Sequence, residues 1–488
     1  MTIHSVGIDF HQGQHRVRCL DDRAQPCDSF GFQTTPEGLA TFEEHIFKDG
    51  SNPIIVFEPA GIPWLTVAAY LRSRYPDCRL VKAKMQKVAA LRRYLRGPVK
   101  SDRIDALTLA KMPFIDPEQL EEVYLPSAEI HALQRLTRQR KRLESDISGR
   151  KVRIEAIIDG YLPGLRKAFT SPWSTQVRAF LRARLNPFAV VRDGEKALST
   201  FLSKASSRDK GIRAESHQIF QACQAVADIC KVAEPATTIN EEFFMELQDE
   251  MARELRLMET EEAEAESLES RISEIYHKLH PSNNLCTIPG VGEHTAPIFL
   301  ATIGDPARFR NQSAFANWTG VVPRSRQSSN MEAKGLRMTK AGPSIMRMAL
   351  FQSGDIVRRW DPQMAAIYYK QMVSHGKNHK QALGAVMSHL GARVLKVLLE
   401  DRPYELRDID GKSLTRDYAK SLILTKYHVS DDIRRERRRR NSKAGKTGET
   451  AITGQTRQPK LLNLYDSTVS QNNSNGGKVE GQKTLDNY

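Results

Sequence analysis

The sequence is short of cysteine and of long apolar runs. Its 488 residues include six cysteines, and no two of them are spaced as Cys-x-x-Cys. This spacing argues against a zinc ribbon or a disulfide framework and suits a reducing compartment. No segment approaches the roughly 20 consecutive apolar residues that a membrane helix needs, so we expect no membrane partner. The first residues lack a basic start followed by a long apolar stretch, so we expect no export signal.

Acidic side chains are outnumbered by basic ones. The chain has 58 aspartates and glutamates against 73 lysines and arginines, which gives a formal net charge of +15. Such an excess favours a polyanionic partner, and nucleic acid is the first candidate. The length allows two or three domains. We therefore expect a multidomain nucleic-acid-binding protein of the cytoplasm.

The first 125 residues alternate between strand and helix patterns. Short apolar or alternating runs predict strands over 3–8, 15–20, 27–34, 53–57 and 78–81. A capped helix that begins with a proline is predicted after Thr35, and a further helix over 63–75. Asp9 follows the first strand, and Glu58 follows the fourth, whose continuous apolar run predicts a buried central strand.

The stretch Lys100–Ala106 holds two aspartates three residues apart. On a helix, Asp102 and Asp105 share one face, and apolar residues continue the helical pattern behind them. Two adjacent carboxylates repel each other unless a cation holds them, and a divalent metal ion is the usual one. The alternative is a solvated helix face on which Lys100 and Arg103 form ion pairs.

Taken together, the four acids Asp9, Glu58, Asp102 and Asp105 predict a metal site. Central strands lie side by side in a sheet of this order, and a helix packed over them can bring its acids to the strand ends. Four carboxylates around two Mg²⁺ ions, roughly 3.5–4 Å apart, are an arrangement that serves phosphodiester chemistry. The pattern resembles the ribonuclease H-like fold of RuvC-type resolvases, and we assign residues 1–125 to an α/β domain of this kind.

Two long helices are predicted farther along the chain. Residues 126–160 and 241–280 carry apolar side chains at helical spacing; the first has Arg140 and Arg150 at seam positions, and the second is acidic. We expect an antiparallel coiled coil that forms a structural arm or a dimer seam. The intervening residues 161–240 hold short helical patterns broken by prolines, which predict a helical insertion.

Residues 281–405 are predicted to form a helical domain. Within it, Ile288–Gly292 is typical of the turn in a helix-hairpin-helix, where Gly290 and Gly292 let the backbone approach a phosphate. The alternative is a tight turn between two packed helices. The loop that follows is dense in cations, and its candidate phosphate-binding residues are Arg324, Arg326, Lys334, Arg337 and Lys340.

The C-terminal residues 406–488 are predicted to be a basic and largely disordered tail, because few of them are apolar. The arginine-rich run 434–440 is a candidate contact to a nucleic-acid backbone. A solvated basic segment without a partner is the alternative.

The order of these motifs resembles the DEDD transposases of the insertion-sequence-110 family, the bridge-RNA-guided recombinases. The resemblance covers residues 1–158 and about 280–404, whereas the helical insertion and the tail depart from the family pattern. It is carried by Gly7-Ile8-Asp9, Phe57-Glu58-Pro59-Ala60-Gly61, Lys100–Ala106, Ile288–Gly292, Gly320-Val321-Val322-Pro323 and Ser328.

This resemblance implies a DNA recombinase. The four acids would bind Mg²⁺, and Ser328 would attack the DNA phosphate to form a covalent phosphoserine, which conserves the energy of the phosphodiester for strand exchange. Ser329 is a second candidate, because the family usually has glycine after its serine. The resemblance also implies double-stranded DNA as substrate, a guide RNA as partner and a homo-oligomer, since the family assembles its site between protomers.

Two other functions also fit the residues. A RuvC-like hydrolytic junction nuclease would use the acids without a serine nucleophile, so Ser328→Ala and Ser329→Ala would each leave cleavage intact. A non-catalytic nucleic-acid-binding scaffold would depend on charge and shape alone, so Asp102→Asn would leave its activity unchanged.

Overall fold

The computed structural model describes residues 2–48, 50–58, 63–97, 101–205, 212–232, 239–324, 327–328, 331–332 and 336–439. The chain divides into two compact units. The first comprises Met1–Val357 with Met387–Leu406, and the second comprises Arg358–Val386 with Arg407–Tyr488.

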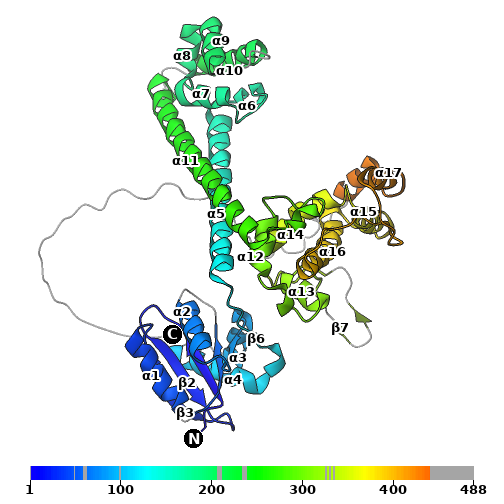
Figure 1. Cartoon of the computed structure of the whole chain (residues 1–488). Helices are drawn as coiled ribbons and strands as arrows, with labels where there is room; N and C mark the ends of the chain where they lie inside the picture. The colour runs from blue at the N-terminus through cyan, green and yellow to red at the C-terminus, as the bar shows by residue number, and fades with distance from the viewer. Residues whose placement is uncertain are drawn as a thin grey trace, which may run out of the picture. The chain divides into compact units, whose positions relative to one another are not determined.

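The described N-terminal residues form a six-stranded mixed sheet (Figure 1). Strand β1 pairs antiparallel with β2 and parallel with β4, and β4 in turn pairs parallel with β5. The order across the sheet is β3 (Pro26–Phe32), β2 (His15–Leu20), β1 (Ser5–Asp9), β4 (Ile54–Phe57), β5 (Arg79–Lys82) and β6 (Glu121–Glu122).

Helices cover both faces of this sheet. On one face, Ile8 of β1 and Ile55 of β4 pack with Phe42 of α1 (Pro36–Phe47) and Leu71 of α2 (Pro63–Arg74) in a shared apolar core. On the other face, Val56 of β4 packs with Val88 of α3 (Met85–Arg96) and Leu109 of α4 (Asp102–Ile115). The period of two along each strand sorts the side chains into these two cores.

The predicted α/β class of this domain and the mainly helical remainder of the chain are confirmed. The predicted strand and helix order agrees with the structure through β5, and the predicted helix that carries Asp102 and Asp105 is α4; helix α3, which lies between them, was not predicted. Strand β6 was not predicted, because two residues carry no periodic pattern.

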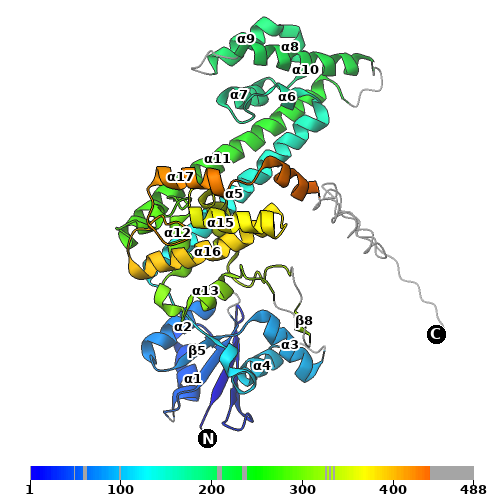
Figure 2. The ribbon, with the colours of Figure 1, turned by 90° about the vertical axis from the view of Figure 1, so that its right-hand side faces the viewer.

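Two long helices run antiparallel to one another, α5 (Ala128–Tyr161) and α11 (Glu241–Leu279) (Figures 1 and 2). Arg150 lies on the α11 side of α5, where its Nη1 and Nε lie 3.0 Å and 2.8 Å from carboxylate oxygens of Glu254 and Glu261. Ile154 of α5 and Met251 of α11 are fully buried in a shared apolar cluster. The paired helices agree with the predicted arm; its classification as a coiled coil stays a prediction.

The insertion between these helices is helical in its described residues. Its helices share one apolar cluster with the ends of α5 and α11. They are α6 (Leu165–Ala168), α7 (Thr175–Ala183), α8 (Pro187–Asp193), α9 (Glu195–Lys204) and α10 (Ile212–Val232).

Short helices follow α11. The first unit continues with the 3₁₀ helix η2 (Asn284–Thr287), α12 (Ala296–Ile303), the 3₁₀ helix η3 (Pro306–Arg308), α13 (Gln312–Thr319), the two-stranded β7 (Gln327–Ser328) and β8 (Met331–Glu332), and α14 (Ser344–Val357). The second unit holds α15 (Pro362–Tyr369), the π-helix η4 (Lys370–Ser374) and α17 (Arg416–Lys426). Helix α16 (His379–Glu400) contributes to both units.

Among the described helices, α16 is long and apolar enough by composition to cross a membrane, which the sequence analysis did not expect. Half of its apolar window is buried inside the fold. Leu390 and Val394 are completely buried. A core helix passes the same test of length and composition, so this finding is weak evidence for a membrane span.

The predicted tail begins too early in the chain. Helix α17 and a further helix over 431–439 are ordered elements of the second unit. The reason is burial of a few apolar side chains, since Ala419, Ile423 and Val429 are all buried. Residues 434–439 of the arginine-rich run lie on the second of these helices, where the Arg437 side chain is only 13% exposed. Residues 440–488 lie outside the described part of the chain.

Candidate functional site

The carboxyl ends of β1 and β4 lie side by side. The two strands are parallel, and Ile8 pairs in register with Phe57. Asp9 and Glu58 are therefore the next residues on neighbouring strands. Because side chains alternate along a strand, Ile8 enters the core beneath α1, whereas Gly7 and Asp9 face α4. The same alternation places Glu58 on the α4 face.

Gly7 allows α4 to approach the sheet closely. A Cβ atom at Gly7 would lie 2.1 Å from the carbonyl oxygen of Ala106 and 2.5 Å from the backbone nitrogen of Ala110. Ser5 Oγ adds a hydrogen bond, donated to the Ala110 carbonyl oxygen at 2.8 Å. Ser101 caps the helix by accepting a backbone N–H of the first turn at 3.4 Å. The start of α4, with its two aspartates, is thereby held at the end of β1.

Three side chains gather at this point: Asp9, His11 and Asp102. His11 Nε2 lies 3.1 Å from Asp9 Oδ2 and 3.5 Å from Asp102 Oδ1. One ligand atom from each of the three lies within 4.8 Å of the others. Neither Glu58 nor Asp105 belongs to this group of described residues. Asp9 is half-buried, whereas the Asp102 side chain is 57% exposed, so the group opens to solvent on the α4 side.

The electrostatics at Asp9 favour a cation. Burial raises the pKa of Asp9, and the carboxylates of Asp105 and Asp102 raise it further. The neighbouring His11 lowers the pKa of Asp9 through its charge and its hydrogen bond. A carboxylate that is penalised by burial and by like charges is stabilised when a positive ion binds beside it.

The loop that carries His11 is held by a second histidine. The backbone N–H of His11 donates to His15 Nδ1 at 3.3 Å, and His15 Nε2 lies 2.7 Å from Thr34 Oγ1. Burial lowers the pKa of His15, which favours its neutral ring. A neutral ring that accepts at Nδ1 donates from Nε2, so both hydrogen bonds are satisfied by one tautomer.

Asp105 is bound by an arginine of the neighbouring helix. Its Oδ1 lies 2.7 Å from Arg92 Nη1 of α3, and Asp105 is only 9% exposed. The prediction that all four acids converge is therefore met only in part: Asp9 and Asp102 meet at His11, whereas the Asp105 carboxylate is paired with a guanidinium. Its charge still acts on Asp9.

Removing the Arg92 charge is expected to destabilise the N-terminal domain. In Arg92→Met the buried Asp105 carboxylate loses its hydrogen-bonded partner, which costs about 1–3 kcal/mol. The double variant Arg92→Met with Asp105→Asn should recover most of this loss, because no buried charge remains. Chemical unfolding of the two single variants and the double variant measures the coupling. Additive effects of the two substitutions would contradict the pairing.

The donor set of the Asp9–His11–Asp102 group suits a divalent metal. Carboxylate oxygens are the ligands that Mg²⁺ prefers, and an imidazole nitrogen adds affinity for Mn²⁺ and other transition metals. The three residues therefore fit a resident divalent ion. Glu58 and Asp105 lie at the same end of the sheet and can serve as further carboxylates.

His11, His15 and Arg92 were not predicted as site residues from the sequence. A signal did exist for His11, because it follows Asp9 by two residues at the end of a strand. No local pattern points to His15 or Arg92, which act through residues 19 and 13 positions away in the chain.

The predicted hairpin of the helix-hairpin-helix connects η2 to α12. Gly290 has φ +84°, and a Cβ atom there would lie 2.8 Å from the Ser353 carbonyl oxygen of α14. A glycine is thus required at position 290 both by the close packing against α14 and by the backbone conformation. The exposed Gly292 donates its N–H to Thr295 Oγ1 at 3.1 Å. Contact of either glycine with a phosphate stays a prediction.

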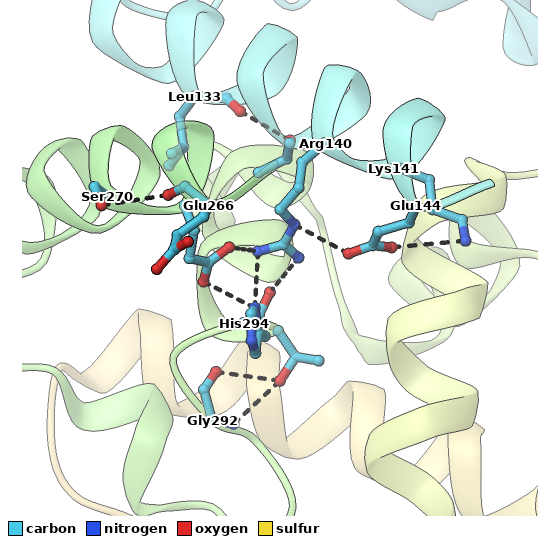
Figure 3. A network of polar contacts seen from close by, with 11 residues as sticks. Leu133, Arg140, Lys141, Glu144, Glu266, Ser270, Gly292 and His294 are labelled. Atoms are coloured by element: carbon cyan, nitrogen blue, oxygen red, sulfur yellow. Dashed lines mark hydrogen bonds and ion pairs between the residues drawn. The ribbon is translucent and has the colours of Figure 1, made fainter. Parts of the chain in front are cut away.

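A buried arginine fastens this hairpin to the arm (Figure 3). Arg140 of α5 points at His294 of the hairpin; Nη2 donates to the His294 carbonyl oxygen at 3.0 Å, and Nη1 contacts its ring nitrogen at 3.1 Å. Nη1 also pairs with Glu269 of α11, and Nε lies 3.3 Å from Glu144. One guanidinium thus joins α5, α11 and the hairpin.

Loss of this guanidinium is expected to weaken the arm. Arg140→Met leaves the His294 carbonyl without its arginine donor and removes one of the two partners of Glu269, whose other partner is the His294 ring at 2.8 Å. Breaking a buried ion pair costs about 3 kcal/mol. Thermal unfolding of the full chain measures the loss. Arg138→Met is the matched control, because Arg138 is exposed on the same helix. Equal melting temperatures for the two variants would contradict the role of Arg140.

The cation-rich loop that contains Ser328, here called the serine loop, has its two ends joined by backbone hydrogen bonds. The backbone N–H of Arg324 donates to the Arg337 carbonyl at 3.0 Å, and that of Lys340 donates to the Gly320 carbonyl at 3.0 Å. The side chains of Arg324, Arg337 and Lys340 are exposed. The backbone of Ser328 lies in β7 and pairs with Met331 of β8. The side chain of Ser328 and residues Arg326, Ser329 and Lys334 lie outside the described part.

Two family models match separate parts of the chain. A model for DEDD transposases of IS110 type matches residues 6–163, and one described as the transposase IS116/IS110/IS902 family matches residues 282–369. The first match contains the Asp9–His11–Asp102 group, and the second contains the hairpin and the serine loop.

Curated relatives agree with these matches. The chain is 32% identical over 128 residues to a pilin gene-inverting protein of Moraxella bovis, which is 26% of this chain and 40% of that protein. It is 24% identical over 350 residues to an uncharacterized protein of insertion element IS110 from Streptomyces coelicolor, covering 71% of this chain and 82% of that protein. The chain thus spans about two fifths of the length of the pilin gene-inverting relative.

Proposed function

Because the chain belongs to the IS110 family of transposases, we propose that it moves an insertion sequence by cleaving and rejoining DNA, with Mg²⁺ at the end of the N-terminal sheet and a serine as nucleophile. The observation that carries the proposal is the convergence of Asp9 and Asp102 with His11. These side chains come from β1, the loop after it and α4, and they meet where a ribonuclease H-like domain would place its metal.

Asp9, His11 and Asp102 would hold the metal, with Glu58 and Asp105 as additional carboxylates. When bound, divalent ions polarise phosphate oxygens and stabilise the charge that develops on the leaving oxygen. Arg92 positions Asp105 and balances its negative charge with a guanidinium. His15 holds the backbone of the His11 loop, so the imidazole of His11 keeps its place beside the two aspartates.

Ser328 is the proposed nucleophile, with Ser329 as the alternative. The serine oxygen forms a bond to phosphorus as the bond to the DNA strand oxygen breaks, and the leaving oxygen takes a proton. A hydroxyl of another strand then attacks the phosphoserine and releases the serine. The number of phosphoester bonds is conserved, so rejoining needs no nucleotide cofactor.

A recombinase is favoured over a hydrolytic junction nuclease by one observation. The relatives from two Moraxella species carry names that describe gene inversion, which requires rejoining of strands after cleavage. A nuclease that passes the phosphate to water cannot rejoin them. The scaffold alternative leaves the grouped carboxylates without a purpose, because like charges that meet at one point are costly unless a cation holds them.

Three further features belong to the proposal. Double-stranded DNA is the substrate, a bridge-type guide RNA is a partner, and two or more protomers assemble the site. The protein acts in the cytoplasm, where the DNA lies. The positive charge of the whole chain supports nucleic-acid partners in general.

The test is to trap the covalent intermediate. Full-length protein is incubated with Mg²⁺ and a suicide DNA substrate that carries an insertion-sequence end and a nick, so that the cleaved fragment diffuses away. Peptide mass spectrometry then maps the residue that is linked to DNA. We expect the link at Ser328 and its loss in Ser328→Ala.

The matched control is Ser313→Ala, because Ser313 is an exposed serine on α13 of the same domain. A link at Ser329 would move the nucleophile by one residue and leave the function intact. Cleavage without any protein–DNA link, unaffected by both serine substitutions, would establish the hydrolase instead.

A further inference from the structure

A hollow lies beside the Asp9–His11–Asp102 group. Its volume is about 450 Å³, and strands β2 and β3 and the start of α4 enclose it. Asp102 lines this hollow and also belongs to the candidate metal group, so the two adjoin. The lining residues are Arg16, Val17, Arg18, Ser29, Phe30, Ser101, Asp102 and Arg103.

Strand alternation puts two arginines into this hollow. Val17 of β2 is buried in the core beneath α1, so its neighbours Arg16 and Arg18 emerge on the opposite face, toward α4. In the register with β1, Arg16 is paired with Asp9 and Arg18 with Gly7. The two arginines are spaced by two residues of a strand, about 6.6 Å. They form a row that leads away from the metal group.

The charge of the hollow is not balanced within the described structure. Arg103 of α4 adds a third guanidinium, and these three cations face the single carboxylate of Asp102. No described residue forms a salt bridge with Arg16, Arg18 or Arg103. Arg92 of the same domain differs, because it is paired with Asp105. Three neighbouring guanidinium groups repel one another, so an anion that binds among them relieves this repulsion.

We propose that this arginine hollow binds the phosphates of the DNA strand next to the phosphate that is cleaved. Guanidinium groups bind phosphate oxygens in pairs of parallel hydrogen bonds, and their spacing along β2 suits successive phosphates of an extended strand. Because Asp102 is shared with the metal group, the occupant of the hollow is continuous with the strand on which the reaction takes place. This inference rests on the proposed function.

The size of the hollow and its contacts define the ligand further. Its volume admits one or two nucleotides and is too small for a duplex, so the bound segment is a single strand at this point. Contacts through arginine to phosphate carry no sequence information. The hollow therefore positions the strand, and sequence recognition belongs to other parts of the complex.

The test measures binding of a labelled single-stranded DNA to the full-length protein in EDTA, so that no cleavage occurs. The triple variant Arg16→Gln, Arg18→Gln, Arg103→Gln should reduce the slope of log K against log salt by about 2, because each phosphate contact contributes about 0.7. At 0.1 M salt this corresponds to a loss of affinity on the order of 100-fold. The matched control is Arg23→Gln, an exposed arginine in the turn at the far end of β2.

Two further variants separate charge from fold. The same three positions changed to lysine should recover most of the affinity and of the salt slope, which a folding defect would not allow. Asp102→Asn should raise the affinity for the strand in EDTA by about fivefold, because it removes a repulsive charge from the hollow. The same substitution is expected to slow cleavage in Mg²⁺ strongly, so its effects on strand binding and on cleavage have opposite signs.

An unchanged salt slope in the triple variant would overturn the proposal. An arginine-dependent affinity for RNA of the same sequence, with DNA binding unaffected, would also overturn it. The covalent-link experiment fails independently of this one. A link to Ser328 together with arginine-independent binding refutes only the arginine hollow, whereas arginine-dependent binding without any link or cleavage refutes only the proposed function.

Discussion

Replacing Asp9 or Asp102 by asparagine is expected to slow metal-dependent DNA cleavage by roughly 1,000-fold or more. Each substitution removes a negative ligand from the group at the end of β1, and metal-bound charge stabilisation of the transition state is worth several kcal/mol. The cleavage rate of a DNA with an insertion-sequence end measures the effect, and isothermal titration with Mn²⁺ measures metal affinity separately. Both quantities should fall together.

The control for this result is Asp22→Asn, since Asp22 is exposed in the turn between β2 and β3 and lies outside the group.

His11→Ala tests whether the imidazole contributes to the metal preference of the site. Because an imidazole nitrogen suits Mn²⁺ better than Mg²⁺, this variant should lose more affinity for Mn²⁺ than for Mg²⁺. Full cleavage by Asp9→Asn and Asp102→Asn would show that the convergence of these side chains has another cause.

Adding one methyl group at Gly7 is expected to disrupt the site as severely. In Gly7→Ala the new Cβ would meet backbone atoms of Ala106 and Ala110 at 2.1 and 2.5 Å, and backbone cannot rotate away as a side chain can. Helix α4 must shift outward, which costs about 1–3 kcal/mol in folding. The shift moves Asp102 away from Asp9, so metal binding should fall although no ligand has been changed.

Chemical unfolding and Mn²⁺ titration of Gly7→Ala measure these two effects. The control is Gly13→Ala in the loop after β1, where a Cβ would have no atom within 4 Å and the variant should bind Mn²⁺ as the wild type does. Normal metal affinity in Gly7→Ala would mean that α4 and β1 do not need this close approach to form the site.

Most strands and helices of the N-terminal domain could be predicted because each is marked by a pattern of residues close together in the sequence. The run Pro53–Phe57 is apolar and is bounded by turn residues, and it forms the buried strand β4. Thr35 and Pro36 begin α1, where Thr35 Oγ1 accepts the N–H of Gly38 at 3.1 Å. A cap, a proline and a periodic pattern each act within one turn of chain, so sequence alone suffices to place such elements.

The site was predicted less completely because its interactions join distant segments. Asp9 and Asp102 were proposed as partners from their positions at the ends of elements, and the structure brings them together. Asp105 was placed with them, but it is bound by Arg92, whose position on α3 gave no indication of this pairing. Ser328 and the acids come from different matched regions, and their meeting at one phosphate stays a proposal.

The contacts between α5 and α11 likewise could be predicted only in part from the sequence. Arg140 and Arg150 interrupt an apolar helical pattern, and both were predicted to lie where this helix meets an acidic helix. Arg150 pairs with α11 as expected. Arg140 does so as well, but its contact with His294 of the hairpin was not foreseen, because a hairpin 154 residues away has no signature in the helix pattern.

Periodicity, capping residues and turn residues, which act over a few neighbours, determined the elements of this protein and the ends at which its acids stand. Tertiary packing decided which charges meet: His11 with two aspartates, Arg92 with Asp105, and three arginines around one hollow. The physical reason is range. Helix caps, the hydrogen bonds within a helix and side-chain alternation act between residues that are close in the chain. An ion pair or a metal ligand set instead depends on atoms that only the packing of distant elements, such as α4 against β1, brings within a few ångströms.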